Sequence, residues 1–255
     1  MTDILQKLLI VCPGYFLAGF TDAVAGGGGL ISLPVAMLAG IPIHTVYGTN
    51  KFAMSIGTAT SVVKYGRSGA IKWKAALTAA AGALIGSAFG ARLALLLSER
   101  YLNMVLMVLL PAAAVFLSLN RGFGAEGQEK SLTPLKFAAY ALLIGLCVGL
   151  YDGFFGPGSG TFYIMLFCSL MGYDLITASG NAKVVNLASN IGALVTFVLA
   201  GKVWFAVGIP CALCAMLGNY VGSSLAVKNG ARFIRPIMAA VIILLFIKVI
   251  SQLFF

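Results

Sequence analysis

The feature that most constrains this chain is the internal duplication of an apolar unit. Residues 19 to 120 and 149 to 252 match each other, largely without a gap, at a shift of 132 positions. Such a duplication is typical of transporters whose binding site lies between two repeats. The pairs at this shift include Lys51 and Lys183, Gly69 and Gly201, Gly86 and Gly218, Gly90 and Gly222, and Arg100 and Arg232; at a shift of 130, Gly19, Asp22, Gly26 and Gly28 match Gly149, Asp152, Gly156 and Gly158.

Composition assigns the chain to the membrane. Apolar residues make up 60% of it, charged residues only 9%, and the mean hydropathy is +1.01. Several apolar runs reach the roughly 20 residues that a helix needs to cross ~30 Å of hydrocarbon. The N-terminal run lacks a basic region before it and a small-residue cleavage site, so we expect a retained helix and no secretory signal. The chain is therefore predicted to be an all-α integral membrane protein.

Each unit contains five apolar segments, of which the second is too short to span a membrane by itself. Glycine-rich stretches that break helices separate it from the first segment. We therefore predict a broken hairpin at the start of each unit, whether its tip crosses the membrane or turns back. The predicted segments are 4–25, 30–40, 45–65, 73–97 and 101–118 in the first unit, and 135–155, 160–172, 175–199, 203–227 and 232–254 in the second.

Such a hairpin begins and ends on one side, leaving three further crossings per unit. An odd number of crossings inverts the second unit relative to the first. Basic loops fall at different positions in the two units, as inversion requires: 64–74 in the first and 228–235 in the second. With these loops and the linker in the cytoplasm, both termini lie outside. We expect one transport domain, residues 1–255, with repeat one at about 4–118, a linker at about 119–134 and repeat two at about 135–255.

The two glycine-rich breaks are the first candidate binding feature. Segments that start near Leu30 and Thr161 would present backbone N–H groups and a positive dipole end, which favour an anion. Alternatively, the glycines only allow close helix crossing. The break residues assigned to substrate binding are Gly26, Gly27, Gly28 and Gly29 in the first unit and Gly156, Gly158, Ser159 and Gly160 in the second.

Two ionisable residue types recur with the breaks. Asp22 and Asp152 each lie four residues before the first glycine, inside an apolar run. A charge there costs several kcal/mol unless it is paired or hydrated. Each carboxylate could couple transport to protons or cations, hold a lysine, or only cap backbone N–H groups at the break.

Lys51 and Lys183 recur in the long third segments, about 12 Å along each helix. Each lysine begins a polar stripe on one helical face, which is typical of the lining of an anion path. The alternative is that the long lysine stems snorkel to the membrane surface. The candidate substrate-binding residues of these segments are Asn50, Lys51 and Ser55, followed in the stripe by Thr58, and Asn181, Lys183, Asn186 and Asn190.

The remaining motifs favour structural roles. The spacing of Cys211 and Cys214 resembles a metal or redox pair, but no second pair or histidine completes a site. His44 is interpreted as a loop residue and Arg92 as an interfacial anchor. The net charge of +10 is explained by membrane orientation rather than by nucleic acid binding. We expect no metal, no cofactor and no catalytic residue; the sequence leaves the oligomeric state open.

Four motifs combine the breaks with the lysine segments. They are Gly19-Phe20-Thr21-Asp22-Ala23-Val24-Ala25-Gly26-Gly27-Gly28-Gly29-Leu30-Ile31, Gly48-Thr49-Asn50-Lys51, Gly156-Pro157-Gly158-Ser159-Gly160 and Asn181-Ala182-Lys183-Val184-Val185-Asn186. In these motifs, and along essentially its whole length, the chain resembles the TauE/SafE family of membrane permeases. The resemblance implies export of sulfite or small organosulfonates across a bacterial inner membrane, coupled to the proton-motive force. The second break departs from the first, with Pro157 and Ser159 where the first has glycine.

The sequence thus predicts a secondary transporter of small anions with two inverted repeats and alternating access around a central site. Its partners would be a small anion, the lipid bilayer and coupling protons at Asp22 or Asp152. Two alternatives stay open: a membrane-embedded binding or assembly subunit that transports nothing, and a carrier of a cation or another small metabolite. An enzyme is disfavoured because no metal set, nucleophile elbow or phosphate loop is found.

Overall fold

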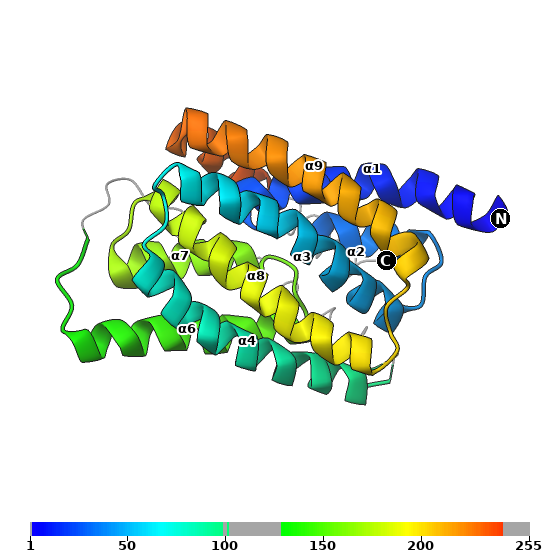
Figure 1. Cartoon of the computed structure of the whole chain (residues 1–255), viewed down its shortest axis with the longest axis horizontal. Helices are drawn as coiled ribbons and strands as arrows, with labels where there is room; N and C mark the ends of the chain where they lie inside the picture. The colour runs from blue at the N-terminus through cyan, green and yellow to red at the C-terminus, as the bar shows by residue number, and fades with distance from the viewer. Residues whose placement is uncertain (1, 99–100, 102–128, 242–255) are drawn as a thin grey trace, which may run out of the picture.

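The computed structural model describes residues 2–98, 101 and 129–241, and every regular element in these ranges is a helix. Apart from residue 101, the predicted segment 101–118 lies outside the described residues, as does most of 232–254. The helices are α1 (Thr2–Ala25), α2 (Gly29–Leu38), α3 (Ile43–Arg67), α4 (Trp73–Leu96), α6 (Pro134–Phe154), α7 (Ser159–Met171), α8 (Leu175–Leu199) and α9 (Phe205–Asn229), with a further helical stretch at 231–241 (Figure 1).

Local sequence signals explain several helix ends. Helix α6 starts with Pro134, whose missing N–H would have no intrahelical partner at that position. Helix α8 is capped by Asp174, whose carboxylate accepts hydrogen bonds from the backbone N–H groups of Ile176 and Thr177 at 2.9 and 3.1 Å. Helix α7 ends at Gly172, which has a positive φ of 75°. The eight predicted segments that lie within the described residues agree with the observed helices to within a few residues.

Five helices are long and apolar enough to cross a membrane, namely α1, α4, α6, α8 and α9. Helices α2 and α7 have only 10 and 13 residues, so the second segment of each unit is as short as predicted. Helix α3 has 25 residues, about 37 Å at 1.5 Å per residue, but it carries too many polar side chains to join the five by composition. Its polar side chains are mostly buried in the helical bundle.

The polar and apolar side chains are distributed in the reverse of the pattern of a water-soluble protein. Large apolar side chains such as Leu9 and Leu199 are 72% and 82% exposed on the outside of the bundle. Charged side chains such as Lys51 and Lys183 are 3% and 0% exposed inside it. An outer surface of this kind suits lipid, and polar groups inside the bundle then have to satisfy one another.

Packing partners are exchanged between the two units. Helix α1 packs along α9, and α6, its equivalent in the second unit, packs along α4. Helices α3 and α8 contact each other in the middle, and each also contacts the fourth helix of the other unit (Figure 1). Short helix α2 packs on α1 and α3, as α7 packs on α6 and α8.

Glycines let the exchanged pairs approach closely. A Cβ atom at Gly86 of α4 would overlap the carbonyl oxygen of Leu146 in α6, and one at Gly218 of α9 would overlap that of Phe16 in α1. Small residues at such contacts allow backbones to approach within van der Waals distance. These two glycines therefore serve close helix packing.

Basic side chains gather at one end of the bundle. This end, on the left in Figure 1, contains the C-terminal ends of α3 and α9 and the N-terminal ends of α4 and α6. The N-terminus of the chain lies at the opposite end, on the right. The basic residues in these helix ends and the adjoining loops are Lys64, Arg67, Lys72, Lys74, Lys130, Lys136, Lys228, Arg232 and Arg235.

Gly218→Leu is expected to destabilise the protein, because the new side chain forces α9 away from the α1 backbone. Overpacking typically costs about 1–3 kcal/mol. Thermal unfolding of the purified protein in detergent measures the effect. Val221→Leu is the matched control, because Val221 lies on the same helix and is 38% exposed. Equal unfolding temperatures for the two variants would contradict the assigned packing.

Candidate functional site

The two helix breaks meet each other in the middle of the bundle. Gly26 and Gly160 are in backbone contact, and a Cβ atom on either would overlap the other residue. Gly26 also has a φ of +77°, a conformation that favours glycine. The hydroxyl of Thr161 donates a hydrogen bond of 2.6 Å to the carbonyl oxygen of Ala25, which is the last residue of α1. A group from the second unit thus satisfies the broken end of a helix from the first.

A buried ion pair lies beside this junction. The Nζ of Lys51 in α3 lies 2.8 Å from Oδ2 of Asp152 in α6, and the two side chains are 3% and 4% exposed. Lys51 also donates a hydrogen bond of 3.1 Å to Oδ1 of Asn190 in α8. The lysine of the first unit is therefore held by two groups of the second.

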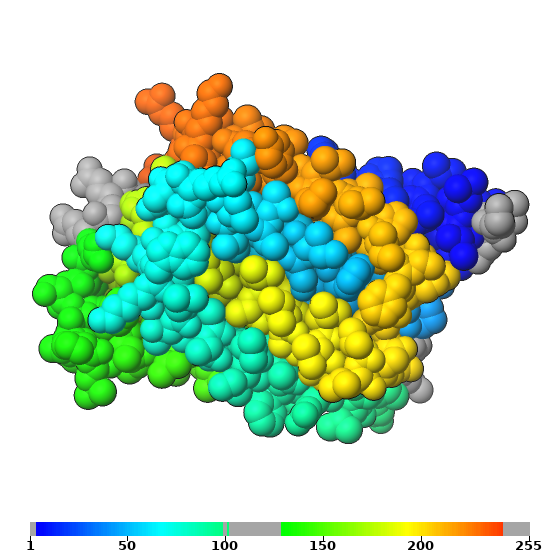
Figure 2. All heavy atoms as spheres, viewed as in Figure 1, coloured from blue at the N-terminus to red at the C-terminus, as the bar shows by residue number. Residues whose placement is uncertain are grey.

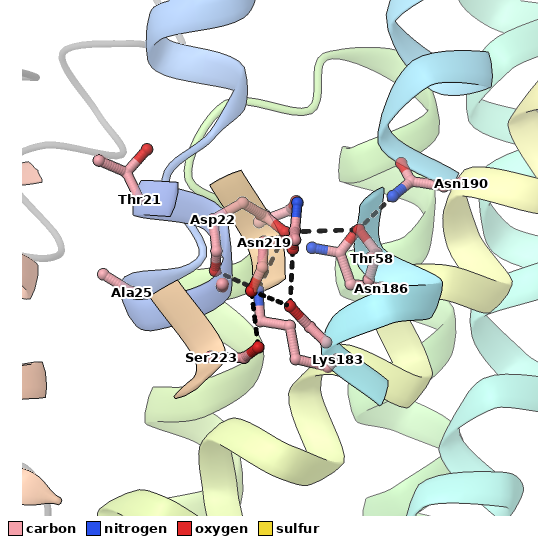
Figure 3. A network of polar contacts seen from close by, with 12 residues as sticks. Thr21, Asp22, Ala25, Thr58, Lys183, Asn186, Asn190, Asn219 and Ser223 are labelled. Atoms are coloured by element: carbon pink, nitrogen blue, oxygen red, sulfur yellow. Dashed lines mark hydrogen bonds and ion pairs between the residues drawn. The ribbon is translucent and has the colours of Figure 1, made fainter. Parts of the chain in front are cut away.

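A second buried ion pair repeats this arrangement with the units exchanged. The Nζ of Lys183 in α8 lies 3.1 Å from Oδ2 of Asp22 in α1 and also donates to the Asp22 carbonyl oxygen. Thr58 of α3 donates to the same carboxylate oxygen at 3.4 Å. Figure 3 shows Lys183 and Thr58 meeting Asp22 from two different helices.

The two clusters occupy equivalent sequence positions. Thr58 and Asn190 are related by the same shift of 132 that relates Lys51 to Lys183. Each lysine could have been neutralised by the aspartate of its own unit, but instead it meets the aspartate of the other. Because an unpaired charge in a low-dielectric interior is costly, each unit needs the other to bury its lysine and its aspartate.

The two aspartates are not held equally. Asp152 accepts hydrogen bonds from the hydroxyls of Ser159 at 2.6 Å and Ser189 at 2.5 Å, in addition to its lysine. At the equivalent positions of the first unit the chain has Gly29 and Gly57, which carry no hydroxyl. The difference at Ser159 is the departure of the second break noted in the sequence.

A small cavity opens on the Lys51 side of the junction. Its water-accessible volume is about 20 Å³, which is enough for about one water molecule. Lys51 and Asp152 line it, whereas Lys183 does not and has no exposed surface. The other lining residues are Asp22, Gly26, Gly29, Leu33, Tyr47, Asn50, Met54, Phe155, Gly156, Ser159, Asn186 and Asn190.

Two buried polar atoms that belong to lining residues have no partner among the described residues. They are the Tyr47 hydroxyl and Oδ1 of Asn50, whose residues are 2% and 7% exposed. Buried polar groups are almost always hydrogen-bonded, so each such group calls for an explanation. A ligand or water in the cavity would satisfy both.

Most of the predicted site residues line the cavity, but seven of them do not. Ser55 donates to the carbonyl oxygen of Lys51 within its own helix, at 2.7 Å. Asn181 accepts a hydrogen bond of 2.8 Å from the backbone N–H of Lys72, which joins α8 to the start of α4. The predicted residues outside the cavity lining are Gly27, Gly28, Ser55, Gly158, Gly160, Asn181 and Lys183.

Sequence reasoning did not select four of the lining residues. Leu33, Met54 and Phe155 are apolar and carried no functional signal. Tyr47 did carry one, because it lies four residues before Lys51 and so extends the polar stripe of α3 by one turn. His44, interpreted as a loop residue, lies instead in the first turn of α3, with its ring 3.3 Å from the carbonyl oxygen of Ala94.

The chain matches known proteins along most of its length. Residues 11–249 match the model of the family described as "Sulfite exporter TauE/SafE". A protein of Sinorhizobium sp. named "Probable membrane transporter protein ORF9" is 36% identical over 237 residues, covering 93% of this chain and 90% of the relative. "Probable membrane transporter protein YfcA" of Escherichia coli K12 is 36% identical over 225 residues, covering 88% and 82%. No solved structure matches the chain significantly.

Asp22→Ala is expected to destabilise the protein strongly, because it leaves the buried Lys183 without a counter-charge. Breaking a buried pair typically costs about 3–5 kcal/mol. The double variant Asp22→Ala/Lys183→Met should recover part of this loss, because it removes the orphaned charge. Thermal unfolding in detergent of the wild type, Asp22→Ala, Lys183→Met and the double variant gives the coupling energy between the two side chains. Additive effects of the two single changes would show that the pair is not coupled.

Proposed function

Because the chain belongs to the TauE/SafE family of multi-pass membrane transporters, which are not enzymes, we propose that it is a secondary transporter. We further propose that its substrates are small anions such as sulfite or short organosulfonates. One observation carries the choice of an anion. The buried Lys51 lines a cavity together with polar groups that have no hydrogen-bond partner among the described residues. Ionisable groups inside a membrane bundle are rare and mark substrate pathways.

The proposed site centres on Lys51. An anion that enters the cavity replaces the Asp152 carboxylate, which lies 2.8 Å from the Lys51 ammonium, as the partner of the lysine. The hydroxyl of Tyr47 then donates the hydrogen bond that it lacks at present. Asn50 donates to the anion through its NH2 group after the amide rotates by half a turn, because the unpartnered Oδ1 can only accept.

Lys183 and Asp22 form the equivalent half-site, of which only Asp22 lines the cavity. Lys183 has no exposed surface and does not reach the cavity. We propose that alternating access exchanges the roles of the two halves, so that one cluster opens as the other closes. The exchanged packing of α1 on α9 and of α4 on α6 supports two inverted repeats within one transport domain.

The proposed topology has the basic end of the bundle in the cytoplasm. The helix ends that gather there carry the basic residues of both predicted cytoplasmic loops. Cytoplasmic loops carry an excess of lysine and arginine, which supports this orientation. Both chain termini would then lie on the outer face of the inner membrane.

Charge balance favours a proton as the coupling ion. The two lysines and two aspartates of the clusters sum to zero charge when all are ionised. A monovalent anion would leave one uncompensated negative charge inside the membrane, which is costly. Protonation of Asp152 would remove that charge and release Lys51 for the anion. Asp22 would serve the other half-site in the same way.

Two other functions are weaker candidates. A cation carrier would need free carboxylates, but Asp22 and Asp152 already hold lysines. A binding or assembly subunit that transports nothing remains the alternative from another class, and reconstitution of the purified chain alone distinguishes it.

Lys51→Met should abolish accumulation of sulfite in proteoliposomes that contain only this protein, because the anion loses its counter-charge. The matched control is Lys72→Met, which removes an exposed lysine from the start of α4. The same vesicles with and without an imposed pH gradient test the proton coupling. Wild-type rates in Lys51→Met would overturn the proposed site, and no accumulation by the wild type of any tested anion would favour the non-transporting alternative.

Tyr47→Phe should weaken anion binding about 10-fold or more, since a hydrogen bond to a charged group contributes about 1.5–3 kcal/mol. Tyr163→Phe is the matched control. The Tyr163 hydroxyl is also buried and has no hydrogen-bond partner among the described residues, but Tyr163 does not line the cavity. Ligand-induced thermal stabilisation measures both, because a ligand that binds only the folded state raises its stability. Equal losses in the two variants would show that Tyr47 acts only through packing.

A further inference from the structure

A groove runs between α3 and α9 on the outer surface of the bundle, near its basic end. Its volume is about 410 Å³. Figure 2 shows the two helices side by side on this face, α3 in light blue to cyan and α9 in orange. The groove is lined by Ala59, Thr60, Val63, Lys64, Arg67 and Tyr220.

The chemistry of the groove changes along its length. Ala59 and Val63 supply apolar surface, and the neighbouring Ile56 and Leu217 are 37% and 56% exposed, so this part of the groove faces lipid. The two basic residues, by contrast, lie in the last turn of α3, at the end of the helix. Apolar lining with positive charge at the membrane surface is the pattern that suits a phospholipid chain and its head group.

The positive charges of the groove are not neutralised by the protein in the part of the chain described here. Lys64 Nζ lies 4.1 Å above the ring of Tyr220, which orients it across the groove. The described carboxylate side chains are all engaged elsewhere. Asp22 and Asp152 hold the buried lysines, Asp174 caps α8, and Glu129 pairs with Lys72. An anion from outside the chain is therefore the natural partner of Lys64 and Arg67.

A second groove at the equivalent place in the other unit allows a comparison within the molecule. This second groove, of about 440 Å³, lies between α8 and α4. Five of its lining residues, between Ile191 and Leu199, lie 132 positions after lining residues of the first groove. Thr196 stands where the first groove has Lys64, and Leu199 stands where it has Arg67. The second groove has one cation of its own, Arg92 of α4, so what distinguishes the first groove is the pair Lys64 and Arg67 at the end of one helix.

We propose that the α3–α9 groove is a binding site for an anionic glycerophospholipid. Lys64 and Arg67 bind its phosphate at the membrane surface, and one acyl chain lies along Ala59 and Val63. The inference depends on the membrane location of the chain and not on which anion the central site carries.

Native mass spectrometry of the full chain in mild detergent, titrated with phosphatidylglycerol, phosphatidylcholine or soluble glycerol 1-phosphate, tests the site. The wild type should bind phosphatidylglycerol well above the other two. The variant Lys64→Gln/Arg67→Gln should bind it about 30-fold more weakly, as expected for two interfacial cations. The control Lys74→Gln/Lys136→Gln removes the same charge at the same end but outside the groove, and it should bind as the wild type does.

A gain-of-function variant keeps the test decisive if the loss variant fails to fold. Thr196→Lys/Leu199→Arg transfers the cations to the second groove and should add one phosphatidylglycerol site per chain. If the wild type bound phosphatidylcholine as well as phosphatidylglycerol, the groove would not select anionic lipid and the proposal would be overturned. Equal binding of glycerol 1-phosphate would identify a soluble-anion site instead and would overturn it too. Unchanged phosphatidylglycerol binding in the loss variant, or no added site in the gain variant, would do the same.

Discussion

The structure depends on the neutralisation of four buried charges. Lys51, Lys183, Asp22 and Asp152 lie inside an apolar bundle whose outer surface suits lipid. Because the free-energy cost of an isolated charge in such a medium is several kcal/mol, the four groups have to meet as pairs. They do so across the two units rather than within them. The pairing therefore ties the halves of the molecule together at its centre.

The glycine-rich breaks make this pairing possible. Each aspartate lies in the last turn of a helix that ends at a break, so its carboxylate points into the junction rather than along a continuous helix. The close backbone contact of Gly26 and Gly160 brings the two helix ends together. Glycines on α4 and α9 allow equally close contact at the flanks. The small residues of this chain thus allow close helix approach both at the flanks and at the junction where the two aspartates lie.

The two units have equivalent ion pairs in the interior and equivalent grooves on the surface, but these differ in individual residues. The two ion pairs are equivalent in position, but both members of the Lys51 pair line the cavity whereas only Asp22 of the Lys183 pair does, and among the two aspartates only Asp152 has serine partners in the described residues. The two outer grooves are equivalent in position, but only one carries Lys64 and Arg67. A duplicated chain can therefore assign different tasks to equivalent positions through single substitutions. Gly29 opposite Ser159 and Leu199 opposite Arg67 are two such cases.

From the amino-acid sequence alone we could predict the helices, their breaks and the recurrence of one lysine and one aspartate per unit, because apolar periodicity, glycine clusters and internal repetition are visible along the chain. The partner of each aspartate could not be predicted in this way. The packing of the helices was needed to show that Lys51 pairs with Asp152, 101 residues away, that Lys183 does not line the cavity, and that Tyr47 does. The physical reason is that these contacts follow from how α3 and α8 cross between the exchanged helix pairs, and a pattern of spacing along one helix carries no information about the helix that packs against it.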